Sequence, residues 1–506
     1  MKNAVLRKRT DLWCVFGFAL LLSAAVMYFC TKSSPGYPIN DWCDANIYLS
    51  IGKGMVQGKV VYRDLYDHKG PLLYALHALA ALISFRDFFG VYVVEIVQTA
   101  FFLFYCHRII SLFGYRKSAW LLVPVIAVGV YASYSFAEGD SAEEMCLPLM
   151  AAQLYLTLRY FDRGEDGPMP PKEQLLCGLL AGCVFWIKFT IIGIPAGLAL
   201  SVLLPAVLHK RWRQAFQSLG WLVMGAFLST VPWLIYFGLN GAIYDWLKVY
   251  LGHNLILYSD AIPLTLTERI CAIGRWIFSW FTRSWCYTPL ILAGPLWLTL
   301  RRRQKGLASS AWLALGFGSF FVFISAKEYI YYGLALAALV PLGMCAVASW
   351  LEPHLEKLNP RRGVMGGLCT GVSLLCVGLC LLGPNINPEK GCAFGADKSE
   401  TMAYQIISAM EIDEDTTLLN LGFMDGGFYT AAGIAPNIKY FCQTNMPLPE
   451  MRSEQRRYVT DELCEYVVTY MKRETQLQHY DLITEAPSPN FWYPQVYLYR
   501  LKAEYR

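Results

Sequence analysis

The chain alternates long apolar runs with short polar segments. A helix needs about 20 apolar residues to cross the hydrocarbon core of a bilayer, and about eleven runs approach that length. The expected spans lie near residues 12–30, 88–106, 118–136, 143–160, 174–187, 190–208, 216–238, 286–300, 308–326, 329–350 and 363–383. The pattern therefore predicts a polytopic α-helical membrane protein with about eleven transmembrane helices.

One apolar run does not fit the series. Residues 71–85 (PLLYALHALAALISF) begin with Pro and are short for a span. Counting them as a crossing would place the basic loop 107–117 outside and the acidic segment 138–144 inside. Since Lys and Arg collect in cytoplasmic loops, we expect residues 71–85 to form a re-entrant or interfacial helix within a first outer loop, residues 31–87.

The charge pattern orients the spans. Basic clusters at 107–117, 209–213, 301–305 and 353–362 are expected in the cytoplasm, and the mixed loop 159–173 joins them. The N-terminus is then cytoplasmic in the plasma (inner) membrane, and the C-terminal segment is extracytoplasmic. The outer face collects the polar segments 31–70, 138–144 and 239–270 with Lys188 and Lys327–Glu328. We expect residues 12–30 to be an uncleaved span, because no Ala-x-Ala-like site follows them, whereas a cleaved signal peptide is the alternative.

The last part of the chain has a different pattern. TTLLNLGFMDGGFY (416–429) predicts a strand and a Gly-rich turn, residues 454–474 an amphipathic helix, and HYDLITEA (479–486) and YPQVYLYRLKAEYR (493–506) two strands. Such alternation predicts a small α/β domain. We therefore expect a transmembrane domain over residues 1–383 and an extracytoplasmic α/β domain over residues 384–506.

Composition supports the membrane assignment. Of 506 residues, 56% are hydrophobic and only 16% are charged, whereas soluble proteins average about 25% charged residues. The net charge of +5 comes from the loop clusters, so it does not indicate nucleic-acid binding. Most of the sixteen cysteines lie in apolar runs, and no CxxC pair or His/Cys spacing predicts a metal site. Four others, Cys43, Cys392, Cys442 and Cys464, are candidates for disulfides that sequence does not pair.

The first outer loop holds the densest polar cluster. In residues 41–74, Asp44, Tyr48 and Ile51 or Gly52 share one face at helical spacing, which favours a short helix lying on the membrane. Arg63, Asp67, His68 and Lys69 then crowd against Pro71. Charges beside a bilayer usually mark function or orientation, and a solvated loop without a role is the alternative.

Three further places carry isolated charges. The segment SFAEGDSAEEM (135–145) holds Glu138, Asp140, Glu143 and Glu144. Helix capping explains some of these acids, yet four exceed what a cap requires, so the segment is a candidate to bind a cation or hold an acceptor. Lys188, within FWIKFTIIGIP, either snorkels or faces an anion. Lys327 begins a Tyr-rich span, where Tyr is ordinarily an interfacial residue.

Together these features resemble the GT-C superfamily of integral-membrane glycosyltransferases. The likeness is to the bacterial relatives of polyprenyl- or dolichyl-phosphate-mannose-dependent mannosyltransferases, which include the lipid A aminoarabinose transferases. It rests on D-x3-Y…G…G-x3-Y-R-D-x2-D-x-K-G-P-L-x-Y in the first outer loop, the acidic second outer loop and the segment LGFMDGGFYTAAGIAP. It covers the whole chain in layout.

The resemblance implies roles for particular residues. Asp44, with Asp41 as its neighbour, matches the acid that orients or deprotonates the acceptor hydroxyl. Lys69-Gly70-Pro71 matches a Lys-Pro element near the lipid phosphate of the donor, here with a Gly inserted. Asp140 or Glu138 would be the acid of the second outer loop, with Glu143 beside it. Lys327 to Tyr332 match a basic-aromatic element in which His is common and this chain has Tyr331.

The implied chemistry is transfer of a sugar from a polyprenyl-phosphate donor to a hydroxyl of a lipid, glycan or protein acceptor. A carboxylate takes the proton of the attacking hydroxyl, and cations stabilise the phosphate as its charge grows. Lys69, with Arg63, His68, Lys188 or Lys327, would supply the cations. Direct displacement inverts the anomeric carbon. No organic cofactor is required; some relatives use a divalent metal (Mg²⁺ or Mn²⁺), which Asp44 with Asp140 are candidates to hold.

The main alternative is a transporter or flippase of lipid-linked sugar that uses the same acids as a substrate path. Transporters tend to carry polar residues at the middle of the bilayer and internal repeats. Here the spans are nearly free of charge and the polar segments gather on one face, which favours surface chemistry. A non-catalytic scaffold or receptor, the third hypothesis, leaves the clustered acids unexplained.

Overall fold

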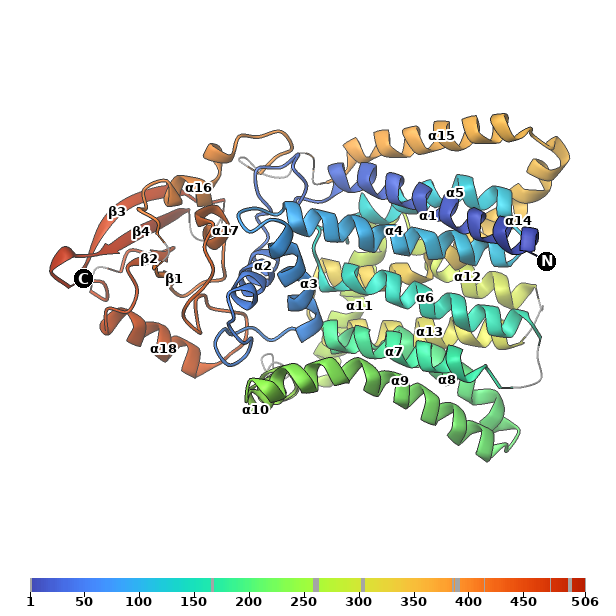
Figure 1. Cartoon of the computed structure of the whole chain (residues 1–506), viewed down its shortest axis with the longest axis horizontal. Coiled ribbons are helices and arrows are strands. Elements are labelled where there is room, and N and C mark those ends of the chain that lie inside the picture. The colour runs from blue at the N-terminus through green and yellow to red at the C-terminus, as the bar shows by residue number, and fades with distance from the viewer. Residues whose placement is uncertain are drawn as a thin grey trace. The chain divides into compact units, whose positions relative to one another are not determined.

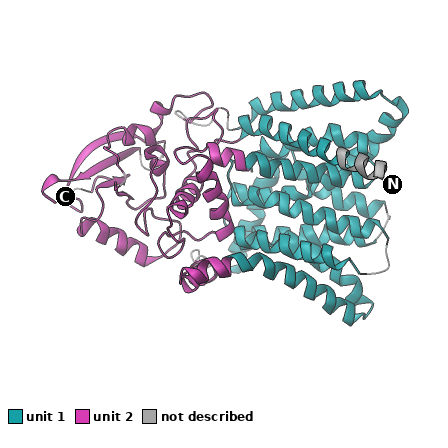
Figure 2. Cartoon of the chain, viewed as in Figure 1, with its two compact units in different colours: residues 1–30, 95–232, 264–384 teal, residues 31–94, 233–263, 385–506 magenta. Residues whose placement is uncertain are grey.

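The computed structural model describes residues 2–164, 168–257, 264–301, 305–384, 386, 392–413, 415–473, 475–489 and 494–505. Its contacts divide the chain into two units (Figure 2). Unit 1 comprises residues 1–30, 95–232 and 264–384. Unit 2 comprises residues 31–94, 233–263 and 385–506, so the first outer loop belongs to the same unit as the C-terminal segment. The division into domains at residue 383 stays a prediction.

The regular elements in the described part of unit 1 are all helices, and the long ones lie side by side (Figure 1). Runs of Leu, Ala, Val and Phe without charges form these helices, because backbone groups in lipid must be satisfied within the segment. The helices are α1 (Lys2–Cys30), α4 (Phe89–Leu112), α5 (Arg116–Tyr131), α6 (Ala142–Asp162), α7 (Pro171–Ile187), α8 (Gly193–Leu208), α9 (Trp212–Leu239), α11 (Leu266–Arg283), α12 (Thr288–Leu300), α13 (Lys305–Phe323), α14 (Val340–Leu358) and α15 (Arg362–Leu379), with 3₁₀ turns η1 (Phe189–Ile191), η4 (Ile330–Leu339) and η5 (Cys380–Leu382). Both α4 and α9 continue into unit 2.

The helices bear out the prediction of a multi-pass membrane protein. Six segments of the described residues are long and apolar enough to cross a bilayer: Asp11–Cys30, Phe89–Leu112, Trp212–Leu239, Lys305–Phe323, Ile330–Leu358 and Arg362–Leu382. The other five predicted runs also fall on helices, namely α5, α6, α7, α8 and α12, which are shorter or carry charges. The amphipathic helix α11 was not predicted.

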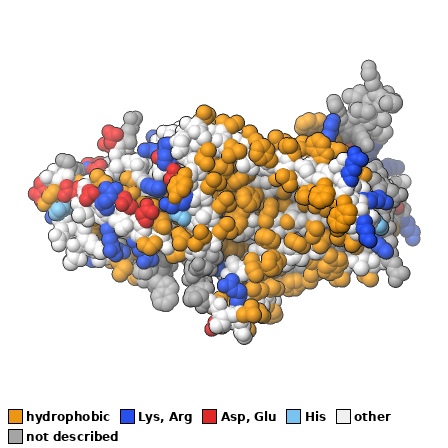
Figure 3. Space-filling model, turned by 90° about the horizontal axis from the view of Figure 1, so that it is seen from below, with side chains coloured by type: hydrophobic (Ala, Val, Ile, Leu, Met, Phe, Trp, Pro, Cys, Tyr) orange, Lys and Arg blue, Asp and Glu red, His pale blue; other side chains and the backbone are white. Residues whose placement is uncertain are grey.

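Apolar side chains cover the flank of unit 1 that Figure 3 shows. On the part of α9 that belongs to unit 1, the exposed side chains include Phe216, Val223 and Phe227, each more than half exposed. Exposed apolar surface of this extent is typical of a face that contacts lipid.

The basic clusters of unit 1 lie at one end of its helices. The helix α1 begins and α4 ends at the end marked N in Figure 1, and the α4–α5, α8–α9 and α14–α15 connections lie there too. Lys and Arg side chains gather at this end in Figure 3. Residues 302–304 of the basic cluster at 301–305 lie outside the described residues. The re-entrant or interfacial placement of residues 71–85 stays a prediction.

Unit 2 contains short helices and one sheet. The helices are α2 (Cys43–Val56), α3 (Pro71–Ile83), α10 (Ile243–Leu247), the π-helix η2 (Lys248–Leu257), α16 (Met402–Ile407), α17 (Phe428–Ala432) and α18 (Pro449–Thr460), with 3₁₀ turns η6 (Lys398–Glu400) and η7 (Ala503–Tyr505). The strands β1 (Leu418–Asn420), β2 (Tyr466–Thr469), β3 (Tyr480–Pro487) and β4 (Gln495–Leu501) form a sheet in the order β1-β2-β4-β3. β1 and β2 are parallel and the other pairs are antiparallel.

The predicted helix over residues 454–474 is wrong in its second half. Its first part lies in α18, which ends at Thr460, and Glu462 then takes a left-handed φ of 58°. Tyr466–Thr469 form β2, whose four residues are all buried between β1 and β4. Val and Thr have high β-propensity, so a Val-Val-Thr run is well suited to a central strand. Packing on both faces of the sheet there outweighs the helical spacing of the apolar residues in the sequence. Glu474 lies outside the described residues.

The segment after β1 binds α2 through a buried carboxylate. Asp425 accepts hydrogen bonds from the backbone N–H groups of Gly427 and Phe428, from Asn420 Nδ2 and from Ser50 Oγ of α2. Lys53, one turn further along α2, donates to the Tyr429 carbonyl at 3.3 Å. The predicted Gly-rich turn therefore anchors the sheet of unit 2 to α2.

Lys53 should make the stability of unit 2 depend on pH. Its burial lowers its pKa from 10.5 to about 7, although the charges of Asp425 and Asp87 oppose this. Between these two pKa values the unfolded chain binds more protons than the folded one, so stability should rise with pH from about 7 to 10, by at most about 1.4 kcal/mol per pH unit. We expect Lys53→Met to flatten this rise, measured by thermal unfolding in detergent across that range. A slope unchanged in Lys53→Met would show that other groups produce it, and the exposed Lys472→Met serves as the control.

All sixteen cysteines are free thiols. These include Cys43, Cys392, Cys442 and Cys464, the four candidates for disulfides that lie outside the apolar runs.

Candidate functional site

The first part of the candidate site is built on α2. Asp44 lies in the first turn of this helix, where a negative charge is favoured by the helix dipole. One turn later, the Tyr48 hydroxyl donates a hydrogen bond to Asp44 Oδ2 at 3.1 Å. Asp44 is 6% exposed, and Tyr48 is 1% exposed. The predicted face of α2 is therefore a buried face that carries the carboxylate, rather than a solvated loop.

The cation near this carboxylate is Lys69, which lies two residues before the start of α3. Gly70 is the N-cap and Pro71 the first residue of α3, a position that needs no N–H. Lys69 Nζ lies 3.8 Å from Asp44 Oδ2 and 5.5 Å from the centre of the Tyr48 ring. The helices can approach because Gly52 faces the backbone of His77, where a Cβ would lie 2.5 Å from the carbonyl carbon. The structure thus brings together the acid and the cation that the sequence placed 25 residues apart.

A second acid and its partners fix the chain before Lys69. Tyr74 donates to Asp67 Oδ2 at 2.6 Å and accepts from the Lys69 N–H at 2.9 Å, and Tyr62 donates to the Lys69 carbonyl at 2.6 Å. His68 Nδ1 lies 3.1 Å from Asp67 Oδ1. These contacts hold Lys69 in place from both sides along the chain.

The charges of this cluster follow from burial and proximity. Burial opposes the ionisation of Asp67, but the charges of Lys69 and His68 and the hydrogen bond from Tyr74 outweigh it, so its pKa is well below its usual range. Burial and the charge of Lys69 lower the pKa of His68, against the opposing effect of Asp67. At neutral pH His68 is therefore uncharged, and Lys69 is the cation of the cluster.

The π-helix η2 packs against the same loop. Tyr66 Oη lies 3.0 Å from His253 Nδ1, and Asn254 Nδ2 donates to the His68 carbonyl at 2.7 Å. π-Helical turns are rare and frequently occur at functional sites. His253 and Asn254 were not among the predicted site residues, since nothing in their local sequence marks them.

Two predicted residues of unit 2 lie apart from this cluster. Arg63 is exposed, pairs with Asp64 at 2.8 Å and donates to the Asn240 carbonyl. Asp41 pairs with Lys32 at 2.5 Å. Neither residue contributes to the buried group formed by Asp44, Asp67 and Lys69.

The acids of the second outer loop lie in unit 1. The Asp140 N–H donates to both Glu95 Oε1 and Glu144 Oε2, each at 2.9 Å, and Asp140 has a left-handed φ of 61°. All three residues are at most 1% exposed. Ser141 caps α6 by accepting from the Glu144 N–H, as the sequence indicated. Glu138 is half-buried.

Glu95 was missed because it lies inside the apolar run 88–106, and its partners follow 45 and more residues later. A single carboxylate within a predicted span is itself a signal for function. Here Glu95 joins Asp140 and Glu144 in a cluster of three carboxylates.

Two carboxylates that share one N–H donor cannot both be ionised at low cost. We therefore expect Glu144→Gln, which replaces a protonated carboxyl by a neutral amide, to keep the thermal stability of the protein in detergent. Glu144→Ala removes an acceptor from a buried N–H and should destabilise by about 1–3 kcal/mol. Equal losses in the two variants would show that Glu144 is ionised in the folded protein.

Lys188 is neutralised by one of the loop acids. Its Nζ lies 2.6 Å from Glu143 Oε1 and 3.8 Å above the centre of the Tyr332 ring, and both charged residues are buried. Lys327 is half-buried, and this burial lowers its pKa to about 8. Tyr331, at the position where the resembling family commonly has His, lies with its ring 5.4 Å from Lys188 Nζ.

Among the described residues, no group of three or more His, Cys, Asp or Glu side chains is arranged to hold a metal ion. Asp44 and Asp140, the predicted metal ligands, belong to different units. A divalent metal stays a prediction, and no step below depends on one.

The described helices form a multi-pass membrane fold, and unit 2 holds the buried acid–cation group of Asp44 and Lys69. No family model and no curated protein matches the sequence. Among solved structures, the chain is similar to ArnT from Cupriavidus metallidurans, at a TM-score of 0.59 and 12% identity for the form bound to undecaprenyl phosphate, covering 97% of this chain and 98% of that one. The apo form gives a TM-score of 0.56 at 11% identity, with the same coverage.

Archaeal oligosaccharyltransferase AglB from Archaeoglobus fulgidus matches at 12% identity, with a TM-score of 0.47, over 97% of this chain and 74% of that one. The ArnT likeness runs over nearly the whole of both chains, which confirms the fold that the sequence pattern predicted.

Proposed function

We propose that the protein transfers a sugar from a polyprenyl-phosphate donor to an acceptor hydroxyl on the extracytoplasmic side of the membrane. The observation that carries the proposal is the buried pair of Asp44 and Lys69, with Nζ and Oδ2 3.8 Å apart. A buried acid beside a cation, outside the membrane spans, is an expensive arrangement that is frequent at catalytic sites. An ArnT structure of the same fold holds undecaprenyl phosphate, which supports a lipid phosphate as the donor's leaving group.

The proposed reaction needs only this chain's own groups and two substrates. Asp44 accepts the proton of the acceptor hydroxyl as its oxygen attacks the anomeric carbon of the donor. The bond from that carbon to the phosphate oxygen breaks, and the polyprenyl phosphate leaves with an added negative charge. Lys69 stabilises that charge. The attack and departure occur on opposite faces of the anomeric carbon, so its configuration inverts.

Tyr48, Tyr62 and Tyr74 position these two groups. The Tyr48 hydroxyl donates to Asp44 Oδ2 and so orients the carboxylate, and Tyr62 and Tyr74 fix the backbone of Lys69. Asp67 is already committed to Tyr74 and His68, so it serves the arrangement of the loop rather than the proton transfer.

The proposal can be tested without knowledge of the sugar. Mass spectrometry of envelope glycans and glycolipids, from cells with and without the protein, should show one sugar missing when the protein is absent, with its polyprenyl-phosphate donor accumulating. If the protein were instead a transporter or flippase of the lipid-linked sugar, its absence would leave the donor on the cytoplasmic side. Identical glycan profiles in the two strains would refute both functions.

A further inference from the structure

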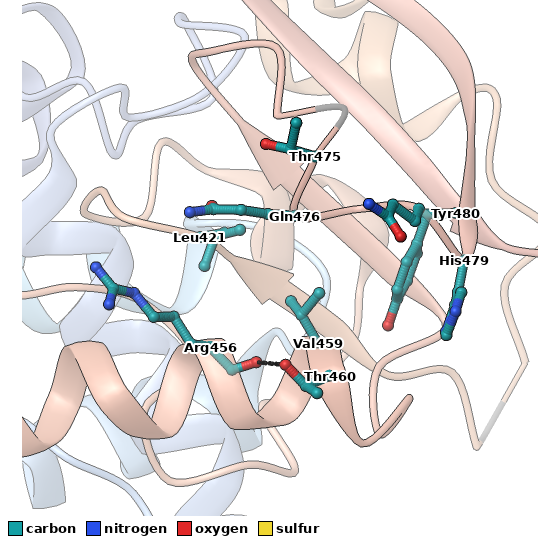
Figure 4. A pocket seen from close by; sticks show the side chains of 9 residues that line it. Leu421, Arg456, Val459, Thr460, Thr475, Gln476, His479 and Tyr480 are labelled. Carbon is teal, nitrogen blue, oxygen red and sulfur yellow. Dashed lines mark hydrogen bonds between the residues drawn. The ribbon is translucent and has the colours of Figure 1, made fainter.

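Unit 2 contains a cavity of about 300 Å³ in its C-terminal part (Figure 4). Its lining residues come from the residue after β1, from α18, and from the segment that leads into β3 together with the first residue of β3. None of them belongs to the Asp44–Lys69 group. Ligand pockets range from about 300 to 1,000 Å³, so this cavity has the size for one small unit rather than an extended chain.

The floor of the cavity is apolar. Leu421, Val459 and Tyr480 line it, and each is only 5% exposed. The Tyr480 hydroxyl donates to the Cys464 carbonyl at 2.9 Å, so it is engaged away from any ligand. The floor therefore offers a fixed apolar surface.

The rim is polar and carries one cation. Arg456 and Thr460 come from α18, and Thr475 and Gln476 come from the segment that faces it, with Leu421 and Val459 between them (Figure 4). The Thr460 hydroxyl donates to the Arg456 carbonyl at 3.0 Å, and Gln476 Oε1 accepts from Arg473 at 2.9 Å. The Gln476 amide nitrogen is thereby oriented as a donor.

Three rim side chains have no hydrogen bond or ion pair within the described part of the chain, namely Arg456, Thr475 and Gln478. The neighbouring Arg457 contrasts with Arg456, since it pairs with both Glu454 and Asp461. Among the described residues that line the cavity there is no carboxylate. Within that described lining, Arg456 carries the charge that a ligand would meet.

One wall is held rigid by stacking. The His479 ring lies on the Tyr505 ring with centroids 4.1 Å apart and an angle of 12° between them, and Glu462 Oε1 lies 2.7 Å from His479 Nδ1. A wall fixed in this way lowers the entropy lost when a ligand binds.

We infer that this cavity binds a single sugar unit that carries a negative charge, a carboxylate or a phosphate. A pyranose presents an apolar C–H face to a floor such as Leu421 and Val459 and hydroxyl edges to amide and hydroxyl groups such as Gln478 and Thr475. Guanidinium groups bind carboxylate and phosphate through paired N–H donors, which is the role of Arg456. The site is separate from the proposed catalytic group and holds a charged glycan while that group acts elsewhere.

The test is equilibrium binding to the purified full chain in detergent, with glucuronic acid, glucose 6-phosphate and glucose as probes. At least one anionic probe should bind about tenfold tighter than glucose, a difference of about 1.4 kcal/mol that one charge-assisted hydrogen bond supplies. Arg456→Gln should abolish that preference, whereas the control Arg452→Gln, on an exposed residue of α18 outside the cavity, should retain it. The two anionic probes distinguish carboxylate from phosphate.

Binding should persist in Asp44→Asn, so failure of the proposed catalytic role leaves the cavity's test intact. Gln478→Ala should weaken the binding of the anionic sugars while leaving the fold unchanged, since its amide makes no hydrogen bond within the described residues. Three results would each overturn the inference: equal affinity for glucose and the anionic probes, no binding of any probe at millimolar concentration, or an unchanged preference for the anionic probe in Arg456→Gln.

Discussion

Asp44→Asn is expected to abolish sugar transfer. The amide keeps the shape of the side chain and its hydrogen bond with Tyr48, but it cannot take the proton of the acceptor hydroxyl. The loss of a positioned base lowers rates by roughly 10²–10⁴-fold. The measurement is transfer of labelled sugar in membranes that contain equal amounts of each variant.

Two acid-to-amide variants serve as comparisons for Asp44→Asn. Asp481→Asn alters an exposed residue of β3 and should leave transfer unchanged. Asp41→Asn discriminates between neighbouring acids: because Asp41 pairs with Lys32, we expect a loss of only a few fold. Full activity of Asp44→Asn would remove Asp44 from the catalytic role, and a complete loss in Asp41→Asn alone would transfer that role to Asp41.

Lys69→Met should produce the second largest effect, a loss of roughly 10²–10³-fold in transfer, the cost of removing one group that stabilises the developing charge. The expected loss lies in kcat, since the charge on the phosphate grows as the bond breaks. Lys69→Arg should retain part of the activity because it keeps the cation. The measurement is the rate of transfer at saturating donor.

Lys69→Met also leaves Asp44 buried without its cation, which is destabilising by about 3–5 kcal/mol in comparable cases. A double variant separates stability from catalysis. Asp44→Asn with Lys69→Met should recover thermal stability relative to Lys69→Met, but it should stay inactive. Recovery of transfer together with stability would show that Lys69 acts only through folding.

The sequence predicted the parts of the site that are close along the chain or share a motif. Asp44 lies at the start of a helical pattern, and Lys69-Gly70-Pro71 marks the start of α3, so both ends of the pair were identified. Asp67 was visible in the same segment, but its commitment to Tyr74 depends on side-chain directions that spacing does not give. Arg63, only six residues from Lys69, points instead toward Asn240.

Contacts between segments that are far apart in the chain could not be predicted from the sequence. Asp425 was seen only as part of a Gly-rich turn, and its contact with Ser50 joins residues 375 positions apart. Glu95 was hidden in an apolar run, and the strand at Tyr466–Thr469 was hidden in a helical pattern. In each case tertiary packing decides, because a buried polar group must find its partner wherever the fold places one.

The measurement that tests the central claim most directly is the fate of the donor lipid. The purified protein is placed in liposomes with an acceptor extract and polyprenyl-phosphate sugars prepared from the same membranes, and the lipids are followed by mass spectrometry. We expect free polyprenyl phosphate and sugar-modified acceptor to appear together in equal amounts, with the sugar inverted at its anomeric carbon, and neither to appear with Asp44→Asn. Movement of an intact donor across the bilayer without release of polyprenyl phosphate would contradict the account.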